Sequence, residues 1–158
     1  MADHPLHLLD TNVLVALMRA KELGQHIDET YKPRQAKFKP IISVVSVGEM
    51  LSLARQFGWG ATKTAEIGKI VENLIVEDIN TPEILAAYAE IDHASRAGGR
   101  KMSKNDVWIA ATAKVAGATL LTTDKDFDHL SVTSLLHKPN MPVIRLIWIN
   151  PNLGSTAE

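Results

Sequence analysis

The stretch Leu6-His7-Leu8-Leu9-Asp10-Thr11-Asn12 decides the fold of this chain. Its first four residues are mostly apolar and predict a short buried strand, and an acid stands where that strand should end. The apolar residues that follow recur at helical spacing, so Thr11 and Asn12 occupy positions typical of a helix start. A strand that enters a helix through such a short turn is the first half of a βαβ unit. Ligands of open α/β sheets bind at this edge, so Asp10 is a candidate functional residue.

Further strands and helices alternate along the rest of the chain. We expect strands at 41–45, 75–79, 118–122 and 142–148, and helices at 46–57, 61–74, 81–97 and 103–117. The polar stretch 24–39 predicts a short helix or a surface loop. Strands separated by helices favour a mainly parallel sheet covered on both faces. We therefore predict a three-layer, Rossmann-like α/β fold with about five strands.

The composition indicates one globular domain, expected at 1–150, with a flexible tail at 151–158. The 158 residues include no cysteine, which excludes disulfides and thiolate zinc sites. No apolar run is long enough for a membrane span and the start lacks the features of a signal peptide, so we expect a soluble, cytoplasmic protein. The net charge of −1 means that any nucleic-acid contact requires a local basic patch.

Two acids lie three residues after a serine at a predicted helix start, in the pattern of a capping box. They are Glu49, after Ser46, and Asp106, after Ser103. Capping explains Glu49 without any chemistry. Asp106, however, also heads a stripe of small apolar residues at helical spacing, which predicts that its side chain points toward the sheet. A buried carboxylate requires a partner.

Two more acids follow predicted strands. A helix-capping role explains the position of Asp10 as well as a functional role does. Asp124 belongs to a loop with three acids in five residues and lies nearest the strand end, whereas Asp126 and Asp128 individually fit a solvated turn. Four acids at one sheet edge would repel one another, since unit charges ~4 Å apart interact by ~4 kcal/mol at an effective dielectric constant near 20. A divalent cation removes this repulsion, and ligation by oxygen alone favours Mg²⁺ or Mn²⁺ over zinc.

Four motifs together resemble the PIN-domain family, and within it the VapC-type toxins of prokaryotic toxin–antitoxin pairs. They are Leu8–Asn12, Ser46–Glu49, Asn105–Ala113 and Leu121–Phe127, and the resemblance extends from about Leu6 to Ile147. It implies an endoribonuclease that depends on Mg²⁺ or Mn²⁺, is inhibited by a small antitoxin and is usually a homodimer. The acidic positions of the family fall on Asp10, Glu49, Asp106 and Asp124. In some members the fourth acid comes two residues later, so Asp126 remains a candidate.

The resemblance implies hydrolysis of an RNA phosphodiester by an activated water. We assign Asp10, Asp106 and Asp124 to the metal, while Glu49 orients the attacking water or binds a second ion. The residues expected to orient these carboxylates or the scissile phosphate are Thr11, Asn12, Thr122 and Asp126. The candidates for binding the RNA backbone are Arg100, Lys101, Lys104 and Lys125, although a solvated helix end explains this basic cluster equally well.

Two other classes of protein also place an acid after the first strand. A phosphatase of the haloacid-dehalogenase type requires a second acid two residues later, where this chain has Asn12. A receiver-type signalling domain requires adjacent acids early in the chain and a late lysine, and a helix that begins near Glu49 does not fit it. A PIN nuclease of RNA processing and a catalytically silent PIN-like binding module remain alternatives.

Overall fold

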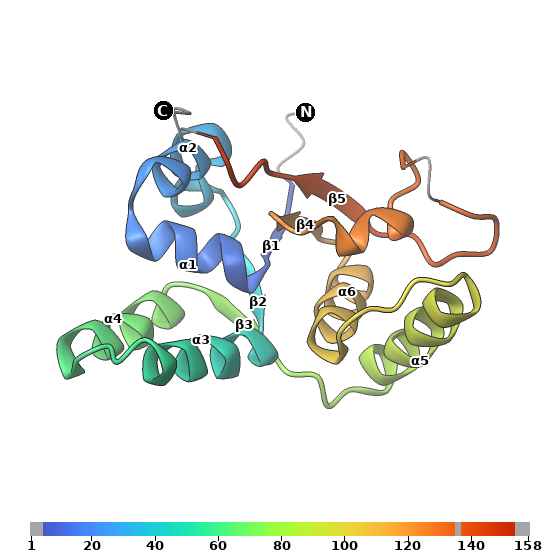
Figure 1. The fold of residues 1–158 in the computed structure, drawn as a ribbon, viewed down its shortest axis with the longest axis horizontal. Coiled ribbons are helices and arrows are strands. Elements are labelled where there is room, and N and C mark those ends of the chain that lie inside the picture. Colours follow the sequence, from blue (N-terminus) through green and yellow to red (C-terminus); the bar gives the residue numbers. More distant parts are fainter. Residues whose placement is uncertain (1–4, 135–136, 154–158) are drawn as a thin grey trace.

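The computed structural model describes residues 5–134 and 137–153 and contains a five-stranded sheet (Figure 1). The strands are β1 (His7–Leu9), β2 (Ile41–Ser43), β3 (Ile75–Glu77), β4 (Thr119–Thr122) and β5 (Arg145–Trp148). The α-helices are α1 (Thr11–Arg19), α2 (Glu22–Tyr31), α3 (Val44–Gln56), α4 (Ala61–Glu72), α5 (Pro82–Ala97) and α6 (Lys104–Ala116), and the 3₁₀ helices are η1 (Pro33–Gln35) and η2 (Lys125–Leu130). The strand order is β3-β2-β1-β4-β5 and every pairing is parallel, which confirms the predicted fold class.

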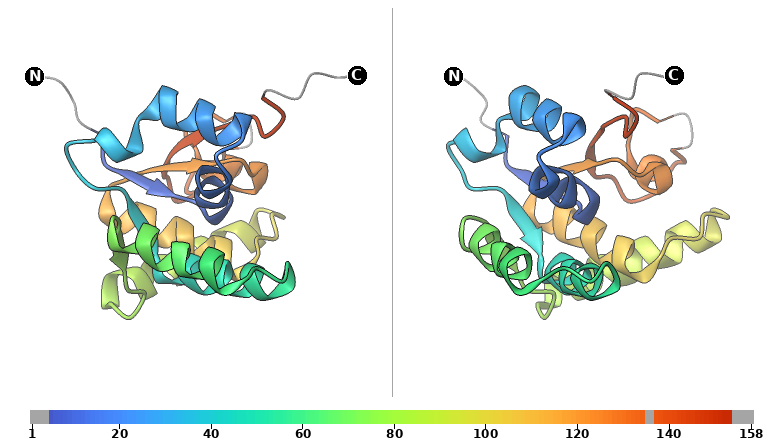
Figure 2. Two further views of the ribbon diagram at one scale, coloured as in Figure 1. Left: turned by 90° about the vertical axis from the view of Figure 1, so that its left-hand side faces the viewer. Right: turned by 60° about the vertical axis from the view of Figure 1, so that its left-hand side comes forward.

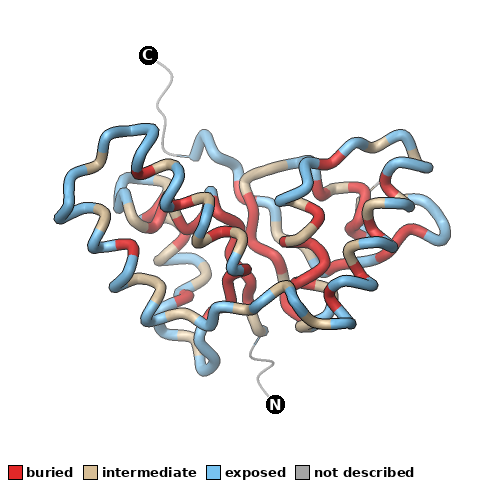
Figure 3. Tube along the Cα trace, turned by 90° about the horizontal axis from the view of Figure 1, so that it is seen from below, coloured by how far each residue is buried: buried red, intermediate tan, exposed pale blue. Residues whose placement is uncertain are grey.

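Neighbouring residues of the central strands supply two separate hydrophobic cores, because successive side chains of a strand point to opposite faces. Leu8 and Leu120 pack with α5 and α6, whereas Leu9 and Leu121 pack with the residues of α1 to α4. In the views of Figure 2 the strands lie between the blue α1–α2 pair and α6. Figure 3 shows the buried residues along the middle of the molecule and the exposed ones on its outer turns. The sheet is therefore the middle of three layers.

The start of α3 differs from the sequence prediction. Sheet pairing ends at Ser43, which lies opposite Glu77 of β3, and the helix begins at Val44 instead of Ser46. Ser43 is the N-cap residue, and its Oγ accepts a hydrogen bond from the Val45 backbone N–H at 3.2 Å. The predicted capping box of Ser46 and Glu49 is therefore wrong, and both residues lie inside the helix.

Other boundaries agree within a few residues. The polar stretch 24–39 contains most of α2 and all of η1. Of the predicted tail, residues 151–153 form a turn, and 154–158 lie outside the described residues. None of the helices in the described ranges is long and apolar enough to cross a membrane.

Substituting Gly24 by Ala is expected to destabilise the protein by about 1–3 kcal/mol, because overpacking a tight contact forces the backbone to shift. Gly24 lies where α2 meets α1, and a Cβ atom there would stand 2.2 Å from the carbonyl oxygen of Ala16. Gly68, inside α4, is a matched control: nothing lies within 4 Å of its added Cβ, so Gly68→Ala should stabilise by about 0.5–1 kcal/mol. Urea unfolding of both variants measures the difference, and equal midpoints would contradict the close approach.

Candidate metal centre

The candidate site lies where the strand order of the sheet reverses. The chain adds β2 and β3 on one side of β1 and then crosses to the other side with β4 and β5. In open parallel sheets, the crevice at the carboxyl ends of the strands beside such a reversal is the usual place for a ligand. Asp10 directly follows β1 and Asp124 comes two residues after β4, so both acids lie at this crevice.

Asp10 is buried, and both of its carboxylate oxygens accept hydrogen bonds. Its Oδ1 accepts from the Thr11 backbone N–H at 2.8 Å, which makes Asp10 the N-cap of α1, and its Oδ2 accepts from the Thr122 hydroxyl at 2.7 Å. Burial raises the pKa of Asp10 to about 6; the carboxylates of Glu49 and Asp124 add to the rise, and the two hydrogen bonds oppose it. Asp10 thus caps a helix and also stands among other acids.

Glu49 reaches Asp10 through Thr11. The Thr11 hydroxyl lies 2.7 Å from Oε1 of Glu49, to which it donates, and 2.9 Å from Oγ of Ser46. Ser46 and Glu49 are three residues apart on α3 and so share one face of that helix. The partner of the Glu49 carboxylate is therefore the residue next to Asp10, and not the start of its own helix.

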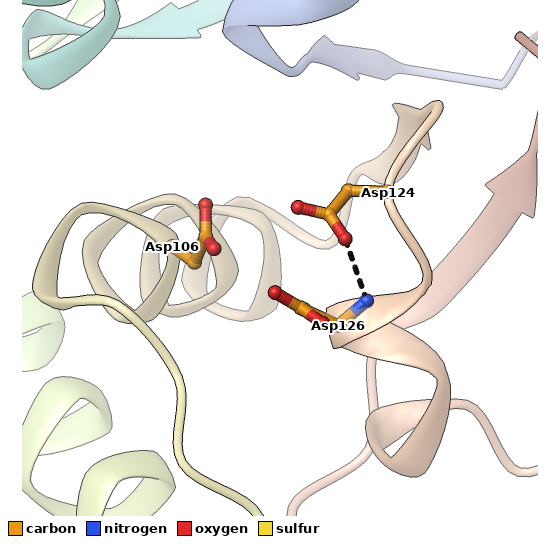
Figure 4. Close-up of side chains that lie close together, drawn as sticks. All are labelled: Asp106, Asp124 and Asp126. Atoms are coloured by element: carbon orange, nitrogen blue, oxygen red, sulfur yellow. Dashed lines mark hydrogen bonds between the residues drawn. The ribbon is translucent and has the colours of Figure 1, made fainter.

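Three other carboxylates converge beside this pair. Asp106, Asp124 and Asp126 each offer an oxygen within 4.8 Å of the others. Figure 4 shows them pointing toward one another from α6, from the loop after β4 and from η2. The backbone N–H of Asp126 donates to Oδ1 of Asp124 at 2.8 Å, and that of Asp106 donates to the Oγ of Ser103 at 3.2 Å. The first turn of η2 brings Asp126 back into the cluster.

Thr122 connects Asp10 to the loop that carries Asp124. Its hydroxyl donates to Asp10 and accepts from the Asp124 backbone N–H at 3.0 Å. The residue is fully buried at the end of β4. A single hydroxyl therefore fixes one carboxylate and the backbone of another acid.

The charges of this cluster repel one another. Burial raises the pKa of Asp106 to about 6, and Asp10, Asp124 and Asp126 add to the rise, while the bond with Ser103 opposes it. In the part of the chain that the structure describes, no Lys or Arg forms a salt bridge with these acids. Carboxylates held together without a counter-charge are a suitable donor set for a hard divalent cation.

The remaining predicted residues lie at the surface around the acids. Asn12 is exposed on the first turn of α1. Arg100 is half-buried between α5 and α6, and Lys101 and Lys104 are exposed just before Asp106. Lys125 opens η2, and its ammonium lies 4.4 Å from the centre of the Trp148 ring.

Sequence reasoning missed two residues beside these acids. Ser46 was interpreted only as a cap, whereas it contacts Thr11. Trp148 is not among the residues predicted for the site, although the ends of parallel strands meet at one edge and Trp148 closes the last predicted strand. That position was the available signal.

A pocket of about 430 Å³ lies among α1, η1 and the end of α4, and none of the acids lines it. Apolar side chains such as Leu14, Leu17 and Ile70 form its walls. The carboxylates lie outside this pocket, so the pocket is separate from the candidate metal site.

Fold and site together define a class: a parallel α/β protein with carboxylates gathered at the strand reversal. The pattern of the PIN domain matches residues 7–132, and the chain belongs to the PIN-domain family. A comparison with curated protein sequences gives no match.

Several solved structures with a similar fold are toxin–antitoxin complexes. VapBC2 from Rickettsia felis, bound to a DNA fragment from its promoter, is 18% identical with a TM-score of 0.67, covering 89% of this chain and 98% of that chain. VapBC-5 from Mycobacterium tuberculosis is 20% identical with a TM-score of 0.60, covering 89% and 99%. VapBC-1 from nontypeable Haemophilus influenzae is 24% identical with a TM-score of 0.59, covering 77% and 90%. At these identities the likeness establishes the fold alone.

Proposed function

We propose that this chain is an endoribonuclease dependent on Mg²⁺ or Mn²⁺, and the toxin of a VapBC-type toxin–antitoxin pair. The observation that carries the proposal is the convergence of Asp106, Asp124 and Asp126 beside the buried Asp10. The family membership and the VapBC complexes among similar structures support it. The proposal includes a small antitoxin as partner, a homodimer as the working assembly and the cytoplasm as the compartment.

The donor atoms fit a hard cation, since all of them are carboxylate oxygens and no cysteine is present. We assign the ion to Asp10, Asp106 and Asp124, with Asp126 as a further ligand or as a group that orients Asp124. Each oxygen of Asp10 accepts one hydrogen bond and keeps a second lone pair. When bound, the ion lowers the pKa of a water molecule and offsets the charge that grows on the phosphate oxygens.

The protein's own groups then position the reactants. Thr11 holds one oxygen of Glu49, which leaves the other oxygen to accept a hydrogen bond from the attacking water and to take its proton. Thr122 orients Asp10 and the loop of Asp124. We assign to Asn12, which is exposed at the start of α1, a hydrogen bond donated to the scissile phosphate.

RNA is repelled by an acidic site, so cations must hold its backbone nearby. We assign this role to four residues around the cluster, Arg100, Lys101, Lys104 and Lys125. Each contact with a phosphate adds to the salt dependence of binding, so affinity for RNA should fall as salt is raised.

Expression of the chain in a bacterial host is expected to arrest growth, and co-expression of the neighbouring open reading frame should relieve the arrest. The purified protein should cleave RNA with Mg²⁺ or Mn²⁺ and lose that activity in EDTA, because the carboxylates alone cannot offset the phosphate charge. Cell density and gel analysis of the RNA measure the two effects.

The outcomes separate the alternatives. Cleavage of RNA without growth arrest would assign the chain to RNA processing outside a toxin–antitoxin pair. Full activity in chelator would remove the metal from the proposal. Absence of cleavage with every divalent ion tested would leave a binding module.

A further inference from the structure

Trp148 stands beside the acidic site and is unusually open for a tryptophan, with 37% of its surface exposed. It ends β5, where it pairs in register with Thr122. Neighbouring strands of a sheet lie about 4.8 Å apart, so the backbone of Trp148 is one strand spacing from the residue that holds Asp10 and the Asp124 loop.

The indole ring is fixed in place. Its Nε1–H donates to the carbonyl oxygen of Thr123 at 3.1 Å, so its polar edge is bonded to the segment that leads to Asp124. The contact ties the ring to the same loop that carries the acid. A partly exposed aromatic ring held in one orientation can stack on a ligand without first being ordered.

A cation accompanies the ring. The Lys125 ammonium lies 4.4 Å from the ring centre, within the range of a cation–π contact, and Lys125 follows Asp124 directly in the chain. The ammonium lies over the ring, so a π surface and a positive charge stand together, as the flat base and the phosphate of a nucleotide require.

We propose that Trp148 and Lys125 form a nucleotide-binding site in which the indole stacks on an unpaired base of RNA and the ammonium contacts the adjoining phosphate. This inference rests on the proposed function and adds to it a residue that contacts a base, Trp148. Every base has a π face, so the site is tolerant of sequence. Bases inside a duplex are stacked on one another and do not offer that face, so the site selects unpaired segments.

The chain contains a matched control. Trp59 also has a lysine over its ring, with the Lys63 ammonium 4.3 Å from the ring centre, and it too is partly exposed. Trp59 lies in the turn that joins α3 to α4, which Figure 1 places far from β5. A general affinity of exposed tryptophans for RNA would affect both residues, whereas stacking at the acidic site affects only Trp148.

Binding of a fluorescently labelled, mixed-sequence, single-stranded oligoribonucleotide tests the proposal, with an abasic oligonucleotide of equal length as second probe. Anisotropy titrations use full-length protein carrying Asp106→Asn, and gels verify that the RNA stays intact. Trp148→Ala is expected to weaken binding of the base-containing RNA about tenfold, while Trp59→Ala changes it less than about twofold. Trp148→Phe keeps a stacking face and should lose only about threefold, which guards against a folding defect. The abasic probe should not distinguish the Trp148 variants.

Equal affinities of the Trp148→Ala and Trp59→Ala proteins for the base-containing RNA would overturn the inference. Failure of the protein with both tryptophans intact to bind either probe would also overturn it. A change of oligomeric state in Trp148→Ala, with RNA affinity unchanged, would assign the ring to a contact between copies. The nuclease proposal is tested separately, by cleavage with otherwise wild-type protein. Cleavage that is insensitive to Trp148 refutes only the stacking site, and Trp148-dependent binding without any cleavage refutes only the nuclease.

Discussion

Substituting Asp106 by Asn is expected to reduce metal-dependent RNA cleavage by more than about a thousandfold, since it removes a charged ligand from the proposed ion. The fold should remain intact. The helix cap at Ser103 uses the backbone N–H of Asp106, which the substitution keeps, and the variant loses a carboxylate whose pKa burial and like charges have raised. Cleavage rates with Mg²⁺, circular dichroism and thermal unfolding in chelator measure the two properties independently.

Asp10→Asn should have the same effect on activity, but it tests the second role of this residue. Asn is a good N-cap, so the bond from Thr11 can persist, whereas the bond from Thr122 must rearrange. Asp128→Asn is the matched control, because Asp128 belongs to η2 but lies outside the carboxylate cluster. It should change the rate less than about threefold. An Asp106→Asn protein that retains a tenth of the activity would show that this carboxylate does not bind an essential ion.

The fold could be predicted because apolar side chains mark both faces of the strands. Leu8 and Leu9, and likewise Leu120 and Leu121, form the paired apolar positions of a sheet covered on two sides. Strands of that kind separated by helices must run parallel, and their carboxyl ends must meet at one edge. The position of Asp10 and Asp124 at one crevice follows from this topology.

The boundary at Ser43 could not be predicted from local pattern. Val44 and Val45 are β-branched and extend the apparent strand, and Ser46 offers a second hydroxyl in cap spacing. Pairing with β3, however, ends at Ser43, and this tertiary contact overrides the local preference. Glu49 therefore lies inside the helix, where its carboxylate contacts Thr11 of α1 and does not cap its own helix.

The choice between Asp124 and Asp126 could not be made from spacing either. The sequence places them two residues apart in an acidic loop, where either could face the crevice. The 3₁₀ turn after β4 brings both toward Asp106, so both carboxylates belong to the cluster. The place of Trp148 at the end of the last strand could be predicted, but its contacts with Thr123 and Lys125 could not, because they join segments far apart in the chain.

Lowering the pH through about 6 is expected to weaken binding of Mn²⁺ or Mg²⁺ steeply. The pKa values of Asp10 and Asp106 are both raised to about 6, chiefly by burial, so both carboxyls are ionised at pH 7.5 and protonated at pH 5. A cation must displace each proton that is bound. Two displaced protons reduce the apparent affinity by up to about a hundredfold per pH unit below 6. Calorimetric titration of Mn²⁺ at pH 7.5, 6.5 and 5.5 measures this dependence.

In the absence of metal the same two groups should act on stability in the opposite direction. Their pKa values are above the ordinary value of 3.8, so the folded state holds these protons more tightly than the unfolded chain does. The resulting stabilisation is complete below about pH 4 and is lost as the pH rises through 6. Buried His7 and His129, whose pKa values are lowered by burial, oppose this trend, because the unfolded chain binds their protons first as the pH falls.

The informative quantity is therefore the difference in unfolding free energy between wild type and the Asp10→Asn, Asp106→Asn double variant. Both proteins contain the histidines, so the histidine contribution cancels in this difference. In chelator, the wild type should gain stability relative to the double variant as the pH is lowered from 7 to 5, and saturating Mn²⁺ at pH 7.5 should stabilise only the wild type. If the unfolding free energies of wild type and double variant, measured in urea, changed in parallel with pH, the pKa values of Asp10 and Asp106 would not be raised by folding. The acidic cluster would then be an ordinary polar surface and not a cation-binding site.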